Sequence, residues 1–519
     1  MQTIIHHHTG MLHRISPTTF VAARRNEETC AMLGSTDPLR PCYHFVAPGA
    51  PAWPFDPNGC ICWKRRFHLF YIFQNHDLPM MGHSWGHASS ADLVRWTIHP
   101  PALVPGPDDP EVGIFSGCAL LSREGVPTLV YHGVEAGTCI ATANDDELIG
   151  WTKSPHNPVI PEPMKPDDPG YGVYNVFDPH VWREGDRYLA ILGGRVKPRD
   201  EFDTAYLFES RDLVTWRYLH PLYEPRPEWT DAGDDCACPD FFELRGQHVL
   251  LCISHRTGAR YYLGDYADGR FHPRKHHPMN FPGGSTFAPE TLLDDRGRRV
   301  MFAWVPEART QAAQERAGWS GVMTLPRVLD LDARRQLTIE PTCEVESLRH
   351  HERRLDPFNV GDGENIRIDD VSGRNLELWV EAEVTTGGRF GLDVCVTEDG
   401  GERTRIVHDD AARTLSIDTT RSSLSEDIVR PFPNPYDPKV DETKGVRDVP
   451  VQTAPFDRDG QRLTLRIFVD GSILEVYANG RQCVTQRIYP TRPDAVGVHV
   501  FGDGGSVSVS RFDAWDMAK

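Results

Sequence analysis

"FDPHVWREGDRYLAILGG", residues 177–194, places a short motif and a hydrophobic run about one β-hairpin apart. The same pairing recurs four more times along the chain. The five motifs are FDPNG from 55, FSGCAL from 115, FDPHVW from 177, CPDFFEL from 238 and APETLL from 288. They stand about 50 to 60 residues apart, a period typical of the blades of a β-propeller. The sequence therefore predicts five four-stranded blades around a central axis.

Each motif falls on the strand expected to lie innermost in its blade. The acidic or polar residues of the motifs would then gather near the axis, and they are Asp56, Ser116, Asp178, Asp240 and Glu290. A single exposed aspartate is usually only solvated surface. Several carboxyl groups brought to one funnel mark a candidate site.

After about residue 345 the pattern changes to alternating strands such as LTLRIFVDGSILEVYANG at 463–480. This alternation is typical of a β-sandwich. We therefore predict an all-β protein, a five-bladed β-propeller followed by a C-terminal β-sandwich. The expected parts are an N-terminal extension at 1–40, the propeller at 41–340, a linker at 341–357 and the sandwich at 358–519.

The chain is acidic, with 55 lysines and arginines against 74 aspartates and glutamates and a net charge of -19. Nucleic-acid binding needs a basic stripe, so we expect no nucleic-acid partner. The N-terminal stretch MQTIIHHHTGMLHRISPTTF lacks the apolar core of a signal peptide, and no later run could span a bilayer. We therefore expect a soluble, cytoplasmic protein with no membrane partner. A homo-oligomer stays open, and no C-x-x-C pair with partner spacing predicts a metal site.

The ordered motifs resemble those of glycoside hydrolase family 32, the β-fructofuranosidase, invertase, inulinase and levanase group. The resemblance covers nearly all of residues 40–519 and rests on WPFDPNG (53–59), WGHASSADLVRW (85–96), FSGCAL (115–120), FDPHVW (177–182), CPDFFEL (238–244), LPRVLDL (325–331) and LRIFVDGSILEVYANG (465–480). It implies a propeller with a sandwich, no cofactor, and a small carbohydrate as the substrate.

By position, the resemblance makes Asp56 the nucleophile and Asp178 the stabiliser of the transition state. A retaining mechanism needs a carboxylate that attacks the anomeric carbon and an acid that protonates the leaving oxygen. The expected substrate-binding residues are Trp53, Asn58, Trp85, His87, Phe115, Ser116, Phe177 and Asp240. Ordinary blade packing is an equal alternative for Trp85 and His87, and a bracing role is the stronger alternative for Asp240.

Three positions depart from the family's motifs. Phe55 replaces the asparagine before the nucleophile, and Phe177 replaces the arginine of the R-D-P segment. Ala237 replaces the glutamate that precedes C-P-D, and a methyl group cannot transfer a proton. His255 and Arg260 are candidates to replace the lost arginine, although surface positions suit them as well.

Three explanations of Ala237 stay open: an engineered change from glutamate, a natural subgroup whose acid has moved, and a propeller that binds sugar without cleaving it. Several unusual residues occur together, which favours the natural subgroup. Glu290 is then the expected acid/base residue. The predicted activity is a retaining glycosidase acting on β-fructofuranosides or related furanosides, such as sucrose and fructans. The alternatives are a fructosyltransferase or an enzyme that forms or cleaves difructose dianhydrides.

Overall fold

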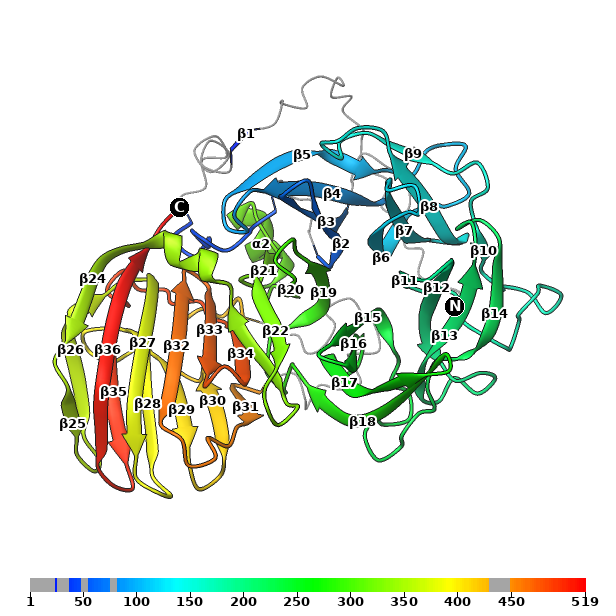
Figure 1. Cartoon of the computed structure of the whole chain (residues 1–519). Coiled ribbons are helices and arrows are strands. Elements are labelled where there is room, and N and C mark those ends of the chain that lie inside the picture. The colour runs from blue at the N-terminus through cyan, green and yellow to red at the C-terminus, as the bar shows by residue number, and fades with distance from the viewer. Residues whose placement is uncertain (1–23, 26–36, 48–54, 75–81, 429–448) are drawn as a thin grey trace.

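The computed structural model describes residues 24–25, 37–47, 55–74, 82–428 and 449–519. Five sheets stand around a common axis, and two larger sheets pack face to face beside them (Figure 1). The predicted all-β architecture, a five-bladed propeller followed by a sandwich, is therefore confirmed. Within the described ranges, no helix has the length and apolar character needed to cross a membrane.

Each blade is an antiparallel sheet whose first strand lies at the axis. The first strands contact one another in the closed order β2, β6, β11, β15, β19 and back to β2. Blades one and two contain β1 (Arg24–Arg25), β2 (Pro57–Trp63), β3 (Arg66–Gln74), β4 (His83–Ser90), β5 (Trp96–Leu103), β6 (Ile114–Leu121), β7 (Pro127–Gly133), β8 (Gly137–Ala143), β9 (Trp151–Lys153) and β10 (Ile160–Pro161). Blades three and four contain β11 (Pro179–Glu184), β12 (Arg187–Arg195), β13 (Asp203–Ser210), β14 (Trp216–Pro221), β15 (Ala237–Leu244), β16 (Gln247–Ser254), β17 (Gly258–Ala267) and β18 (Arg270–Pro278). Blade five contains β19 (Phe287–Leu293), β20 (Arg299–Val305), β21 (Val322–Met323), β22 (Arg327–Leu331) and β23 (Leu337–Pro341).

The sandwich consists of one sheet of seven strands and one of six. The first sheet contains β24 (Arg349–Leu355), β25 (Phe358–Val360), β27 (Asn375–Val384), β32 (Leu463–Asp470), β33 (Ile473–Ala478), β34 (Gln482–Arg487) and β36 (Val507–Met517). The second contains β26 (Asn365–Ser372), β28 (Arg389–Val396), β29 (Thr404–Asp409), β30 (Thr414–Asp418), β31 (Val451–Pro455) and β35 (Gly497–Asp503). A helix, α2 (Gln311–Ala317), lies in blade five, and a 3-10 helix, η1 (Cys343–Leu348), follows β23.

The first strands of the blades share a backbone irregularity at their amino ends. The pairing of β2, β6, β15 and β19 with their second strands shifts register there. Asp178, Cys238 and Ala288 have φ values of 42°, 45° and 44°, and each precedes a proline. Positive φ is uncommon for residues other than glycine, and such positions concentrate at functional sites. A bulge at this point re-aims the side chains that follow it.

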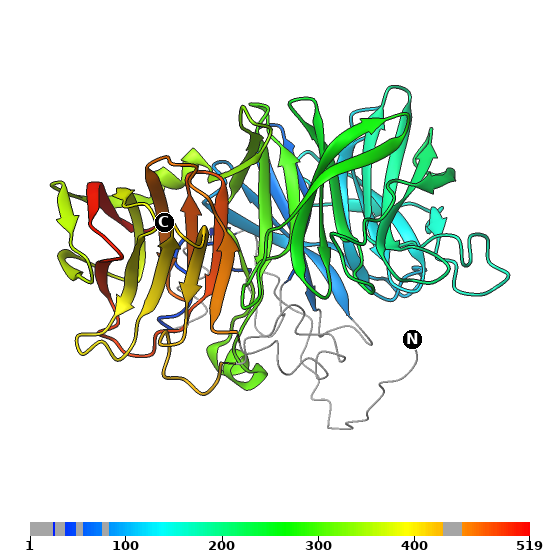
Figure 2. The same ribbon diagram turned by 90° about the horizontal axis from the view of Figure 1, so that it is seen from below.

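The connection between the two domains is shorter than the predicted linker at 341–357. β24 begins at Arg349 and pairs with β36, so it belongs to the sandwich. The boundary predicted at residue 358 is therefore wrong, because a charged strand at the edge of a sheet, RHHERRL, carries little apolar pattern. Only the segment from 342 to 348, mostly η1, joins the domains. The two domains lie side by side (Figure 2).

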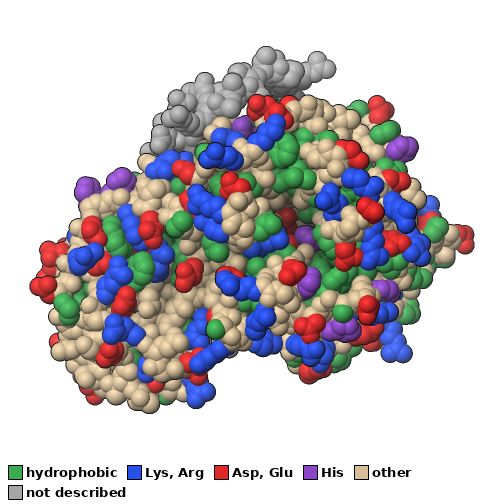
Figure 3. Space-filling model, in the orientation of Figure 1, with side chains coloured by type: hydrophobic (Ala, Val, Ile, Leu, Met, Phe, Trp, Pro, Cys, Tyr) green, Lys and Arg blue, Asp and Glu red, His purple; other side chains and the backbone are tan. Residues whose placement is uncertain are grey.

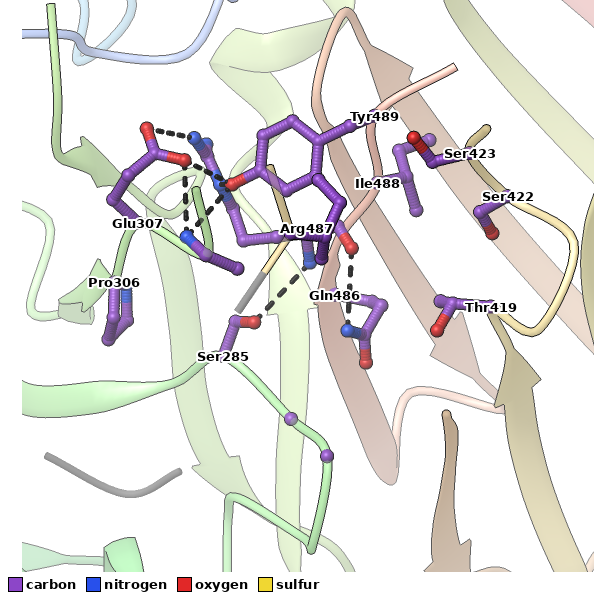
Figure 4. A pocket seen from close by; sticks show the side chains of 14 residues that line it. Ser285, Pro306, Glu307, Thr419, Ser422, Ser423, Gln486, Arg487, Ile488 and Tyr489 are labelled. Atoms are coloured by element: carbon purple, nitrogen blue, oxygen red, sulfur yellow. Dashed lines mark hydrogen bonds and ion pairs between the residues drawn. The ribbon is translucent and has the colours of Figure 1, made fainter. Parts of the chain in front are cut away.

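A buried cluster of charges also joins the two domains. Glu307, which follows β20, accepts from Arg487 Nη2 of the sandwich at 2.9 Å and from Arg309 Nη2 at 2.9 Å. Tyr489 donates its hydroxyl to the same carboxylate (Figure 4). Glu307, Arg487 and Tyr489 line a pocket at the domain boundary, and their polar groups are largely engaged with one another. We therefore assign this cluster a structural role.

Candidate active site

Two carboxylates meet at the amino ends of the first strands. Asp56 precedes β2 and Asp178 precedes β11, and both are buried. The Cys238 thiol lies between them, with Sγ at 3.7 Å from Asp56 Oδ2 and 3.5 Å from Asp178 Oδ2. Ser116 donates its hydroxyl to Asp56 Oδ2 at 3.2 Å. Four consecutive blades thus contribute one side chain each to a single cluster.

The backbone around the cluster fixes both carboxylates. The side-chain amide of Asn58 donates to the Asp56 carbonyl at 2.8 Å, and its oxygen accepts from the Gly117 N–H at 2.9 Å. Asn58 therefore ties β2 to β6 and has its polar groups occupied within the protein. Asp178 Oδ2 accepts from the Cys238 N–H at 2.9 Å. Asp56, Ser116 and Asp178 thus come together at one cluster, as the sequence predicts.

Burial determines the electrostatics of the two carboxylates. Desolvation raises the pKa of Asp56 to about 6, although the Ser116 hydrogen bond opposes that rise. Desolvation raises the pKa of Asp178 to about 7, and the charge of Asp56 raises it further. Among the described residues, no lysine or arginine forms an ion pair with either carboxylate. The arginine expected at the position of Phe177 therefore has no substitute among these side chains.

A closed ring of eight aromatic side chains, here called the aromatic collar, surrounds this end of the axis. Neighbouring ring centroids are 4.9 to 6.3 Å apart. In order around the axis the collar contains Phe55, His83, Phe115, His132, Phe177, His255, Phe287 and Trp304. The predicted binding residues Phe115 and Phe177 belong to it, and the collar gives the cluster an apolar rim.

The four phenylalanines of the collar occupy equivalent positions in their blades. Each directly precedes the position held by Asp56, Ser116, Asp178 or Ala288. The corresponding residue of blade four is Ala237, which is fully buried beside Cys238. Its methyl group leaves blade four without a ring from β15. His255, at the end of β16, fills that place in the collar.

Trp85 and His87 are both fully buried, which favours blade packing over the predicted place in a sugar subsite. Trp85 is fully buried and donates its indole N–H to the Phe115 carbonyl at 3.0 Å. His87 is fully buried and stacks on Phe70 with ring centroids 4.5 Å apart. Trp85 packs between blades one and two and His87 within blade one, the blade packing that the sequence left equally open. Trp53 lies outside the described residues.

Asp240 braces two blades and is closed off from any ligand. It is fully buried, and its Oδ2 accepts from the Thr291 N–H at 2.8 Å and from the Thr291 hydroxyl at 2.5 Å. These bonds join β15 to β19. The predicted substrate contact of Asp240 is therefore wrong, and the bracing role that the sequence favoured holds.

Glu290 does not join Asp56 and Asp178, contrary to the prediction. It lines a separate cleft together with Cys60, His180 and Arg299. Figure 3 shows a hollow at the centre of the propeller with acidic and histidine side chains in its depth. Burial and the charge of Asp240 raise the pKa of Glu290 well above its usual value. Its place in this other cleft, and not its pKa, argues against Glu290 as the proton donor to a group held between Asp56 and Asp178.

The position of Glu290 within its motif explains why it lies away from Asp56 and Asp178. Ala288 precedes a proline and has positive φ, as Asp178 and Cys238 do, so these three positions are equivalent. Glu290 comes two residues later and matches His180 and Asp240, which lie farther along their strands. The A-P-E motif therefore places a methyl group, and not a carboxyl group, level with the cluster.

Of the two candidates for the lost arginine, only one lies at the site. Arg260 is buried, and its guanidinium contacts Asp203 of blade three at 3.5 Å and Asp234, which precedes β15, at 3.7 Å. His255 belongs to the collar and is held by Asp235 at 2.6 Å. Among the described residues, no group of three or more histidine, cysteine or acidic side chains is arranged to hold a metal ion.

Comparison with known proteins matches both domains to one family. The model of the glycosyl hydrolases family 32 N-terminal domain matches residues 44–341, and that of the family's C-terminal domain matches residues 344–516.

Relatives of similar length share the whole architecture. Sucrose-6-phosphate hydrolase of Escherichia coli is 27% identical over 508 residues, covering 92% of this chain and 94% of that protein. Fructan 6-exohydrolase of Beta vulgaris is 27% identical over 567 residues, covering 94% and 88%. The crystal structure of fructan 1-exohydrolase IIa from Cichorium intybus superposes with a TM-score of 0.78 at 25% identity and covers 93% of this chain and 98% of that one. The same plant enzyme has been crystallised with 1-kestose.

Proposed function

The chain belongs to glycosyl hydrolase family 32, and from this premise we propose that it is a glycosidase that cleaves β-fructofuranosidic bonds. Its relatives are named for the hydrolysis of sucrose 6-phosphate and of fructans. The substrate is a small carbohydrate that carries a terminal β-fructofuranosyl group. The observation that carries this proposal is the meeting of Asp56 and Asp178 across Ser116 and Cys238.

Asp56 is the nucleophile of a retaining double displacement. Its ionised carboxylate attacks the anomeric carbon of the fructosyl group, and the bond to the leaving oxygen breaks through an oxocarbenium-like state. Water then releases the sugar from Asp56 with retention of configuration. Asp178, which is fixed by the Cys238 N–H, accepts hydrogen bonds from sugar hydroxyls and favours the developing positive charge.

The test is hydrolysis of sucrose, sucrose 6-phosphate, 1-kestose, inulin and levan, followed by chromatography of the products. We expect the wild-type protein to release fructose from at least one of them, and Asp56→Asn to lose about 10³-fold or more in kcat/KM. Glu290→Gln is the matched control, because Glu290 lines the other cleft and contacts neither Asp56 nor Asp178 in the described hydrogen bonds. We expect this variant to keep its activity.

A propeller that only binds sugar would give a different result. It would bind a fructoside with similar affinity in the wild-type and Asp56→Asn proteins, and neither would release a product. That outcome would refute the proposed glycosidase. Equal losses in Asp56→Asn and Glu290→Gln would contradict the assignment of the nucleophile.

The apolar rim supports transfer to a sugar acceptor as a second function on the same scaffold. Seven of the eight rings in the aromatic collar come from phenylalanine, tryptophan or histidines whose pKa burial lowers to about 4. A sugar stacks its C–H face on such rings, whereas water gains nothing from them. Longer oligosaccharides or difructose dianhydrides among the products would identify the transferase.

A further inference from the structure

The proposed reaction needs a proton donor, and the position from which the family supplies it holds Ala237. An alkoxide sugar is a poor leaving group, so its departing oxygen must be protonated in the transition state. Ala237 carries no proton, and Glu290 lies in another cleft. The donor must therefore come from a different group at the cluster.

His255 lies at the end of β16, in the gap that Ala237 leaves in the aromatic collar. Its ring centroid is 6.3 Å from that of Phe177 and 6.2 Å from that of Phe287. Phe177 directly precedes Asp178 in the chain, and the charge of His255 acts on the pKa of both Asp178 and Asp56, so the imidazole faces the carboxylate cluster. About a third of the His255 side chain is exposed, which leaves it open to a ligand.

Asp235 fixes the orientation of this ring. Its Oδ1 accepts from the His255 backbone N–H at 2.9 Å, and its Oδ2 lies 2.6 Å from His255 Nδ1. A carboxylate only accepts, so Nδ1 carries a proton in this pair. Nε2 makes no hydrogen bond within the described part of the chain and lies on the ring edge away from Asp235. Nδ1 is thus held by Asp235, and Nε2 is available to exchange a proton with a ligand.

The charges around His255 favour its protonated form. Asp235 raises its pKa most, and the charges of Asp178 and Asp56 raise it further against the effect of burial. Arg195, 3.7 Å from Asp235, is the neighbouring cation. His83 and His132 are the internal comparison, because burial lowers the pKa of each to about 4. Among the three histidines of the collar, His255 is therefore the one whose pKa is raised, which favours its imidazolium form.

We propose that His255, oriented by Asp235, is the catalytic acid/base residue that takes over from the missing carboxylic acid at position 237. This inference rests on the proposed glycosidase activity and names a residue of the same site. Asp235 precedes Ala237 by two residues, so the histidine pair and the vacated position belong to the same end of blade four.

The proton balance of both steps runs through Nε2. In the first step the Asp56 carboxylate forms a bond to the anomeric carbon, and the electron pair of the breaking bond goes to the leaving oxygen. That oxygen takes the proton from Nε2, and the imidazole becomes neutral. In the second step water attacks the same carbon and gives a proton to Nε2 as Asp56 leaves, which restores the imidazolium.

The experiment compares two leaving groups in wild-type and His255→Gln proteins. One substrate is the natural sugar fructoside that the wild-type protein cleaves, and the other is p-nitrophenyl β-D-fructofuranoside, whose phenolate leaves without protonation. We expect His255→Gln to lose about 10²- to 10⁴-fold in kcat/KM on the sugar substrate. On the aryl substrate we expect a loss below about tenfold, because general acid assistance contributes little there. His272→Gln, an exposed histidine of β18, is the control that keeps both activities.

Two further measurements separate catalysis from a structural role. Azide needs no general base, so it should accelerate turnover of the aryl substrate by His255→Gln and yield fructosyl azide. Asp235→Asn removes the charge that raises the pKa of His255, so the basic limb of the pH–kcat/KM profile should move to lower pH. A folding defect would produce neither rescue by azide nor a shift of the basic limb.

Each other outcome overturns the inference. Equal losses on both substrates without azide rescue would show that His255 only binds or supports the site. Selective loss on the sugar substrate in Asp178→Asn, but not in His255→Gln, would make Asp178 the acid. A wild-type protein that cleaves no fructoside overturns the proposed function and this inference with it, whereas a His255→Gln protein that keeps wild-type activity on the sugar substrate overturns the inference alone.

Discussion

Asp178 bears the consequence of the substitution next to it. Phe177 stands where the sequence pattern would place an arginine, and no lysine or arginine of the described residues forms an ion pair with the buried carboxyl group of Asp178. Its pKa of about 7 shows that ionisation inside the folded protein is unfavourable. Catalysis requires an ionised Asp178, whereas burial in the folded protein disfavours this charge. Such a conflict between activity and stability is common.

This conflict predicts that Asp178→Asn stabilises the protein at alkaline pH. The folded-state pKa lies above the unfolded one, so the folded state binds more protons and stability falls as pH rises between about 4 and about 7. Asparagine removes that ionisation and should add about 1–3 kcal/mol at pH 8, measured by thermal unfolding. Well below pH 4 the carboxyl group is protonated in both wild-type states, so the gain should vanish there. A variant less stable than wild type at pH 8 would contradict this account.

At the scale of strands, the blade repeat could be predicted because each first strand carries its motif and each second strand its hydrophobic run. The runs that begin near residues 67, 127, 187, 248 and 299 correspond to β3, β7, β12, β16 and β20. Asp56, Ser116 and Asp178 could be predicted to converge because they stand at the same point of three such strands.

The depth of a side chain along the axis could not be predicted. This depth depends on the positive φ values of Asp178, Cys238 and Ala288. A glycine in the sequence would indicate such a backbone conformation, whereas an alanine does not. For that reason the sequence predicts Glu290 beside the nucleophile, whereas it lies two residues beyond the position equivalent to Asp178. The phenylalanines of the aromatic collar were recognisable in the aligned motifs, where four of the five blades carry phenylalanine before the key residue and blade four carries Ala237.

Strand β15 therefore provides a test of whether Ala237 is native to this site. Ala237 pairs with Ile253, is fully buried, and belongs to a core cluster that includes Phe287. A glutamate there must enter a packed apolar environment, so Ala237→Glu should cost about 2–4 kcal/mol of stability and should not raise activity. Thermal unfolding and kcat/KM on the same fructoside measure both effects. A gain in activity of several orders of magnitude would instead support an engineered loss of the glutamate.

At the scale of the molecule, charged groups hold the sandwich against the propeller on two sides. Arg327 of β22 lies 3.0 Å from Glu475 of β33, and His44 lies 2.9 Å from Asp470 of β32. On the other side Glu307 accepts from Arg487 and Arg309. The core cluster that contains Phe302 of the propeller also contains Phe468 and Trp515 of the sandwich. We therefore expect the two domains to unfold together.

Glu307→Gln tests this coupling, because it leaves two buried guanidinium groups without their carboxylate. Removing one member of a buried ion pair costs about 3–5 kcal/mol, so the variant should melt at a clearly lower temperature at neutral pH. The ion pairs hold the pKa of Glu307 at about 2, below its usual 4.5. This stabilisation is present above about pH 4.5 and disappears as the pH falls through about 2, so the difference between wild type and variant should shrink at acid pH. Glu352→Gln, which removes an exposed partner of Arg354, is the matched control and should change stability by about 0.5 kcal/mol or less. A single calorimetric transition that shifts as a whole would establish common unfolding, whereas two transitions of which only one moves would show that the domains are stabilised separately.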